Sequence, residues 1–201
     1  MIDRQRKGSG RKPRKPHAPL DSARLEELAI AYVARFATSA GRLRAYCTRK
    51  LRERGHEGAS DGATPPDVDA LVRRFLERGY VDDSNFARAK ASGLIRRGYG
   101  ARRVSDALRA DGIEETLRER VAPDEGDRRE AAAVYGRRRR FGPFAREPLA
   151  ARDQREREKQ LAALLRAGHD AGHARQVLDA VSIAEIEDWI AEAREQEDPP
   201  A

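Results

Sequence analysis

The sequence has little of several features that would identify a particular kind of protein. It contains one cysteine, Cys47, so an internal disulfide is impossible, and a reducing, cytoplasmic compartment is expected. No apolar run approaches the roughly 20 residues of a membrane span, and the basic N-terminus lacks the apolar core of a secretory signal. Aromatic residues make up 5% and charged residues 37% of the chain, which is polar for one globular core but suits a thin array of helices.

Sequence motifs of common enzymes are also missing. There is no GxxxxGK[ST] phosphate-binding loop and no GxSxG nucleophile turn. His169 and His173 have the spacing of a helical metal pair, but the residues between them include Asp170 and no catalytic glutamate, and no third ligand is evident. A surface or capping role is the better interpretation of both histidines. We therefore expect no enzyme, metal or cofactor, although a carboxylate pair formed by folding would be invisible here.

The net charge of +7 is distributed unevenly along the chain. Residues 1–19 carry a charge of +6 and residues 183–201 a charge of −6, so the part between them carries +7. A basic body suits a polyanion, or a protein that holds one, whereas a solvated surface without a partner is the alternative. We expect residues 1–21 to be a disordered basic arm and residues 183–201 an acidic C-terminal helix and tail.

Apolar residues recur at the spacing of α-helices throughout the rest of the chain. In the first such segment they are Leu25, Leu28, Ala29, Tyr32, Val33 and Phe36. Helix-capping residues precede these patterns at Asp21 or Ser22, Thr38 or Ser39, Thr64 with Pro65, and Asp82 to Ser84. Because no sustained strand alternation occurs, the sequence predicts an all-α fold of about nine or ten helices. Cys47 falls on an apolar helix face, which favours a buried structural thiol.

A short motif recurs three times, as LRERGH, LRADGI and LLRAGH. Its glycines, Gly55, Gly112 and Gly168, are separated by 57 and 56 residues, and each follows the middle helix of a group of three. A glycine at such a point allows the chain to turn with a positive φ. The spacing predicts three tandem three-helix repeats, at 22–80, 81–123 and 124–182, that form an elongated curved array. Such arrays present long surfaces that suit filamentous partners.

Residues 79–113 carry the most specific pattern. Its parts are Gly79-Tyr80-Val81-Asp82-Asp83, Phe86-Ala87, Arg97-Gly98-Tyr99-Gly100, Arg103, Leu108 and Gly112-Ile113. This stretch resembles the middle repeat of the RecX family, and the segments KLRERG and EKQLAALLRAGHDAGHARQVLDA extend the resemblance over about residues 22–181. The long loop at 55–66 and a proline-bearing insertion in the third repeat depart from the family pattern.

The resemblance implies a modulator, usually an inhibitor, of the RecA recombinase. Proteins of this family lodge in the helical groove of the RecA–single-stranded DNA filament, block its growth, and reduce ATP hydrolysis and strand exchange in recombination and the SOS DNA repair response. They need no cofactor. We expect this chain to act as a monomer, without a membrane, and with RecA as its partner.

The expected contact residues are arginines around the Gly-Tyr-Gly break, the tyrosine itself, and a later run of four arginines. They are Arg88, Arg96, Arg97, Tyr99, Arg102, Arg103, Arg109, Arg137, Arg138, Arg139 and Arg140. Arginine forks onto carboxylates of a protein or onto phosphates. Tyr99 is either a stacking platform and interface anchor or a core residue. The sequence leaves open whether single-stranded or double-stranded DNA is also contacted directly.

Three other functions use the same residues differently. A helical nucleic-acid-binding module without a recombinase partner would use the arginines and the basic arm, and its affinity for naked DNA would fall steeply with salt. An enzyme such as a nuclease would need a site that no motif reveals. A helical scaffold for another protein would be identified by its partner.

Overall fold

The computed structural model describes residues 18–145 and 153–197, and this part of the chain consists of helices joined by loops. The α-helices are α1 (Ser22–Val33), α2 (Ala40–Arg54), α3 (Val68–Glu77), α4 (Asp83–Ile95), α5 (Ala101–Ala110), α6 (Glu115–Arg120), α7 (Glu125–Arg139), α8 (Gln154–Arg166), α9 (Ala171–Asp179) and α10 (Ile183–Glu197). There are also two short 3₁₀ helices, η1 (Ala59–Asp61) and η2 (Gly142–Phe144). Within these ranges there is no strand beyond one bridge between Leu20 and His56, so the all-α prediction is confirmed.

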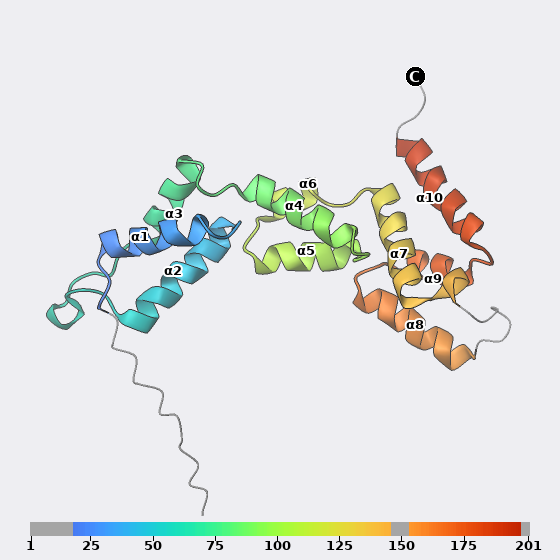
Figure 1. Cartoon of the computed structure of the whole chain (residues 1–201), viewed down its shortest axis with the longest axis horizontal. Coiled ribbons are helices and arrows are strands. Elements are labelled where there is room, and N and C mark those ends of the chain that lie inside the picture. Colours follow the sequence, from blue (N-terminus) through green and yellow to red (C-terminus); the bar gives the residue numbers. More distant parts are fainter. Residues whose placement is uncertain (1–17, 146–152, 198–201) are drawn as a thin grey trace, which may run out of the picture.

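The helices lie in three groups along the long axis of the molecule, α1–α3, α4–α6 and α7–α9, with α10 added to the last (Figure 1). The first two groups each have one apolar cluster of buried residues, centred on Phe75 and Leu108. The third group has two clusters, which contain Val177 and Leu164. The expected elongated array is therefore confirmed, while the repeat boundaries at 22–80, 81–123 and 124–182 stay a proposal. No helix among the described residues has the length and apolarity needed to cross a bilayer.

Side-chain caps begin α1, α2 and α4 at residues that the sequence predicts. Asp21, Ser39 and Asp82 accept hydrogen bonds from the backbone N–H groups three residues later, at distances of 2.7, 3.2 and 2.9 Å. At the start of α10, Ser182 accepts the N–H of Glu185 at 3.2 Å. Such bonds satisfy N–H groups that have no partner inside the helix.

The predicted start of α3 was wrong. The helix begins at Val68 with Asp67 as its cap, and the Asp67 carboxylate accepts the Ala70 N–H at 2.9 Å. Thr64 cannot cap a helix that has Pro65 as its first residue, because Pro66 follows. A residue that precedes a proline is disfavoured in the helical region of φ and ψ.

The expected arm of residues 1–21 is too long at its C-terminal end. Leu20 is 1% exposed and belongs to the first apolar cluster. Its N–H donates to the Gly55 carbonyl, and its own carbonyl accepts the Glu57 N–H, both at 3.1 Å. Leu20 is therefore part of the folded first group, whereas residues 1–17 and 198–201 lie outside the described residues.

The three glycines of the repeated motif do end the middle helices α2, α5 and α8. Gly55, Gly112 and Gly168 have φ values of 74°, 75° and 95°, a region that side chains with a Cβ rarely adopt. The sequence did not predict a second role of two of these glycines, which is to let neighbouring groups approach closely.

Neighbouring groups are joined in the same way at both junctions. The N-terminal end of α2 rests on the turn after α5, and a Cβ on Gly41 would lie 2.7 Å from the Gly112 Cα. The N-terminal end of α5 rests on the turn after α8, and a Cβ on Gly100 would lie 2.3 Å from the Gly168 carbonyl carbon. Each contact brings the carbonyl end of a later helix to the N–H end of an earlier one, so opposite partial charges of the two helix ends meet.

Candidate partner-binding surface

A hollow of about 450 Å³ lies at the junction of the second and third groups. It is lined by Tyr99, Arg103, Tyr135, Arg138, Arg139, Ala163, Arg166 and Ala167. Four arginines from α5, α7 and α8 therefore line the hollow, and none of its lining residues in the described part of the chain is a carboxylate. Within the described residues none of these four arginines forms an ion pair. Arg138 donates to the Arg97 carbonyl, and the Arg139 guanidinium lies 5.8 Å from the centre of the Phe141 ring, but neither contact neutralises the positive charge.

Close backbone contacts position the two sides of this arginine hollow. The Gly100 N–H donates to the Ala167 carbonyl at 3.0 Å, and the Arg102 N–H donates to the Gly168 carbonyl at 3.2 Å. On the α7 side, a Cβ on Gly98 would lie 2.7 Å from the Tyr135 nitrogen. Because there is no room for side chains at these points, the second and third groups have a fixed relative position there.

His169 strengthens the same junction from inside. Its side chain is buried, its Nε2 lies 3.1 Å from the Gly98 carbonyl oxygen, and its ring meets the edge of Tyr135. Burial lowers the pKa of His169, and the hydrogen bond to Gly98 offsets only part of this effect. A neutral ring that donates from Nε2 satisfies the carbonyl. The predicted surface or capping role of His169 was therefore wrong.

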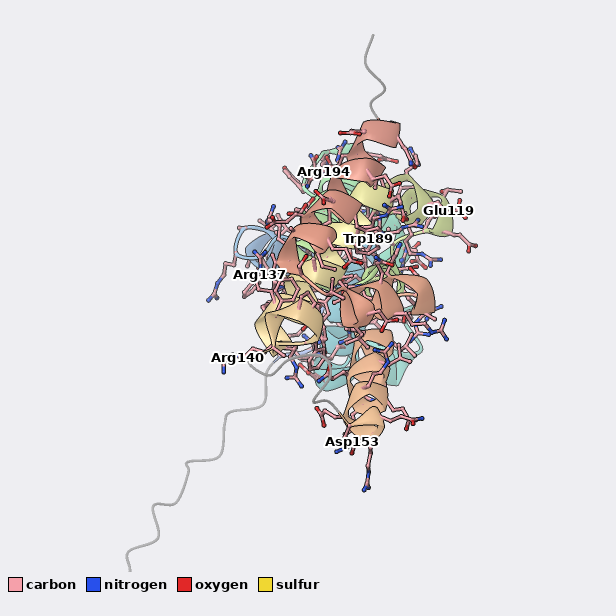
Figure 2. All side chains as sticks on the ribbon, turned by 90° about the vertical axis from the view of Figure 1, so that its right-hand side faces the viewer. Glu119, Arg137, Arg140, Asp153, Trp189 and Arg194 are labelled. Carbon is pink, nitrogen blue, oxygen red and sulfur yellow. The ribbon has the colours of Figure 1, made fainter. Side chains whose placement is uncertain are left out.

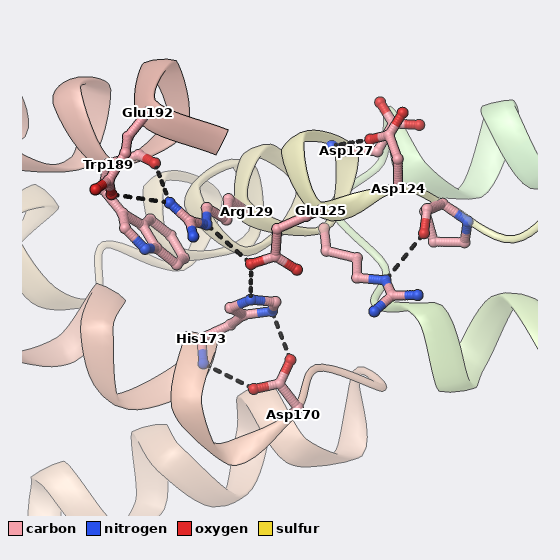
Figure 3. Close-up of polar contacts among 10 residues, drawn as sticks. Asp124, Glu125, Asp127, Arg129, Asp170, His173, Trp189 and Glu192 are labelled. Atoms are coloured by element: carbon pink, nitrogen blue, oxygen red, sulfur yellow. Dashed lines mark hydrogen bonds and ion pairs between the residues drawn. The ribbon is translucent and has the colours of Figure 1, made fainter. Parts of the chain in front are cut away.

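His173 is part of a separate polar cluster that joins α7, α9 and α10 (Figure 3). Its Nε2 lies 2.8 Å from a Glu125 oxygen, and its Nδ1 contacts Asp170. Arg129 binds Glu125 at 2.9 Å and donates to the Trp189 carbonyl at 2.6 Å. Burial acts to raise the pKa of Glu125, but hydrogen bonds from Arg129 and His173 lower it overall. No group of three metal-ligating side chains suited to an ion occurs in the described ranges.

The hollow brings together only some of the residues expected at a contact surface. Tyr99, Arg103, Arg138 and Arg139 line it. Arg96 and Arg97 are exposed just after α4, and Arg138 donates to the Arg97 carbonyl, which places that backbone beside the hollow.

Arg102 lies beside the hollow rather than in it. Its guanidinium donates to the Leu165 carbonyl at 2.9 Å, and it lines a second hollow together with Arg128 and His173.

The remaining expected residues are held elsewhere. Arg88 donates to Asn85, and Arg109 pairs with Asp106 at 2.7 Å on its own helix. Arg137 lies beside α10, 3.9 Å from Glu187, and does not line the hollow. Arg140 ends α7 with a φ of 59° and is exposed. Figure 2 shows Arg137 and Arg140 apart from each other in the end-on view.

Arg166 is the functional candidate that the sequence interpretation missed. It lies at the end of α8, is exposed, and belongs to the same lining as Arg103. Its position in the repeated segment LLRAGH was the available signal. Tyr99 packs partly against the second apolar cluster and also lines the hollow, while its role as a stacking platform or interface anchor stays a prediction.

Comparisons with known proteins agree on one family. Residues 82–121 match the description "RecX, second three-helix domain". The chain is 30% identical over 182 residues to a regulatory protein RecX of Myxococcus xanthus, covering 89% of this chain and 94% of that protein. It is 35% identical over 111 residues to a regulatory protein RecX of Thermus thermophilus, covering 55% and 71% of the two chains.

A solved structure has the same fold. The crystal structure of a regulatory protein RecX superposes with a TM-score of 0.53 at 17% identity, and the match covers 78% of this chain and 72% of that one. Together with the extent of the similarity to the Myxococcus protein, this leads to one conclusion: the chain belongs to the RecX family of regulatory proteins.

Proposed function

We propose that this protein is a non-enzymatic regulator that binds the RecA–single-stranded DNA filament in the cytoplasm as a monomer. It reduces RecA ATP hydrolysis, filament growth and strand exchange in recombination and SOS DNA repair. The observation that carries the proposal is the arginine hollow, where four exposed arginines that have no ion pair among the described residues line one junction of the array. The RecX family membership supplies the partner.

The shape of the molecule supports a filamentous partner. An array of three helical groups extended along one axis can contact more than one protomer of a filament at once (Figure 1). Linked contacts raise the overall affinity because the second contact forms at a high effective concentration. A ligand held along a filament groove in this way blocks the approach of further protomers.

The charge of the hollow supports an anionic contact. Arginine forms paired hydrogen bonds with carboxylates and phosphates, and a RecA–DNA filament offers both. Charge-assisted hydrogen bonds contribute about 1.5–3 kcal/mol each and are not additive. Because these guanidinium groups are solvent-exposed in the free protein, we expect the net effect of two of them to be about tenfold to a hundredfold in affinity.

A charge-matched pair of variants tests the proposal. Arg103→Ala with Arg166→Ala removes one arginine from each side of the hollow. Arg52→Ala with Arg73→Ala removes the same charge from exposed positions in the first group. The DNA-dependent ATPase of the cognate RecA is measured against increasing amounts of each variant, and circular dichroism checks the fold.

We expect the hollow variant to need about tenfold or more protein for half-inhibition, and the control variant to behave as the wild type does. Equal inhibition by a folded hollow variant would exclude this surface as the contact. Binding of the wild type to naked DNA with a steep salt dependence, and no effect on RecA, would favour the nucleic-acid-binding module instead.

A further inference from the structure

We propose that the arginine hollow is a nucleotide subsite, in which Arg103, Arg138, Arg139 and Arg166 hold phosphate and the ring of Tyr99 stacks on a nucleobase. The nucleotide comes from single-stranded DNA or from a free nucleoside phosphate. This inference deepens the proposed function, because it names what occupies the site at the second junction of the array.

The size of the hollow fits one nucleotide. Its volume of about 450 Å³ lies within the range of roughly 300–1,000 Å³ that is typical of small-molecule sites. A paired base has both of its faces covered by its neighbours in the stack, so only an unpaired base offers a free face for Tyr99. The hollow therefore suits a single strand or a free nucleotide.

The charge of the lining selects an anion with several oxygens. Cations come from three helices, and no lining residue is acidic. A carboxylate would satisfy one arginine, whereas a phosphate group or a run of phosphodiesters can accept from several at once.

Two tyrosines in the lining, Tyr99 and Tyr135, favour a nucleotide over an acidic peptide as the ligand. Tyr99 is half-buried, and the part of it that is not packed on the second apolar cluster lines the hollow. Tyr135 makes edge-type ring contacts with Phe141 and His169, at centroid distances of 6.2 and 5.7 Å. Because Tyr99 is anchored on the apolar cluster, its ring loses little conformational freedom when a base stacks on it. Aromatic rings beside arginines are the usual surface for single-stranded nucleic acids.

The test compares two oligonucleotides that differ only in their bases. A fluorescent oligo-thymidylate and an abasic strand of the same length carry the same phosphates, and the affinity of the full-length protein for each is measured by fluorescence anisotropy. Tyr99→Leu keeps an apolar side chain for packing but removes the ring. Tyr80→Leu is the matched control, because Tyr80 is 53% exposed and lies in the first group, outside the lining of the hollow.

We expect the wild type to prefer the strand with bases by about tenfold, which corresponds to one stacked base. Tyr99→Leu should lose this preference and Tyr80→Leu should keep it. Arg103→Ala should weaken the binding of both strands equally, because it removes a phosphate contact only. ATP that competes with the oligonucleotide would assign the site to free nucleotides, and competition by longer strands alone would assign it to DNA.

Equal affinity of the wild type for the two strands would overturn the subsite, and so would a failure to bind either strand and ATP. A preference that survives in a folded Tyr99→Leu variant would do the same. These failures are distinct from failure of the proposed function, which would appear as unchanged RecA ATPase in the presence of the wild-type protein.

Discussion

Replacement of Gly100 by alanine tests whether the second and third helical groups are held by close backbone contact. Gly100 caps α5 with a φ of −75°, so alanine can adopt its backbone conformation and only the space for the methyl group matters. A Cβ there would lie 2.3 Å from the Gly168 carbonyl carbon and oxygen and 2.3 Å from the His169 nitrogen. Because these are backbone atoms, the two groups must separate by about an ångström or more to restore ordinary contact distances.

The separation has a cost that can be approximated from the contacts it breaks. Overpacking costs about 1–3 kcal/mol, and each of the two hydrogen bonds across the junction contributes about 0.5–1.5 kcal/mol. We therefore expect Gly100→Ala to lower the free energy of unfolding by about 2–6 kcal/mol, measured by urea denaturation with circular dichroism.

Gly93→Ala is a control that should change the free energy of unfolding in the opposite direction. Gly93 lies inside α4, and nothing lies within 4 Å of a Cβ placed there. Alanine at this position should raise the free energy of unfolding by about 0.5–1 kcal/mol, because glycine is unfavourable within helices. A Gly100→Ala protein as stable as the wild type would show that the junction is looser than described.

Three further predictions concern single side chains. Leu108 is fully buried in the second group, so Leu108→Ala should lower the free energy of unfolding by about 2–5 kcal/mol in urea denaturation, and a loss below about 0.5 kcal/mol would place it outside the core. Burial raises the pKa of the Cys47 thiol to about 11, so a thiol reagent at neutral pH should label it only after unfolding, and rapid labelling of the native protein would contradict its burial. His169 has a lowered pKa in the folded state, so its contribution to stability is full above its unfolded pKa of about 6.5 and is lost as the pH falls further. The stability advantage of the wild type over His169→Gln should therefore shrink below that pH, and a constant difference would exclude a neutral His169.

Much of the fold could be predicted because it depends on local chemistry. Helix caps such as Asp21 and Asp82 act within three residues, and a glycine at the end of a helix determines the turn there. The start of α3 was missed because two local preferences compete there. Asp67 and Thr64 can both cap a helix, and the consecutive prolines decide between them.

The composition of the contact surface could be predicted only in part. Tyr99 and Arg103 belong to a compact motif, so their proximity follows from the sequence. Arg138 and Arg166 lie on α7 and α8, more than thirty residues after Arg103 in the sequence. No local sequence pattern therefore places them beside Arg103. The close approach of Gly100 to Gly168 was equally invisible, because it depends on how one helical group is docked on another.

The most informative measurement is the DNA-dependent ATPase of the RecA from the same organism, titrated with this protein. We predict that ATP hydrolysis falls as the protein is added, and that Arg103→Ala with Arg166→Ala shifts the titration to about tenfold or higher concentrations. Hydrolysis that stays unchanged at saturating amounts of folded wild-type protein would contradict a role as an inhibitor of the RecA filament.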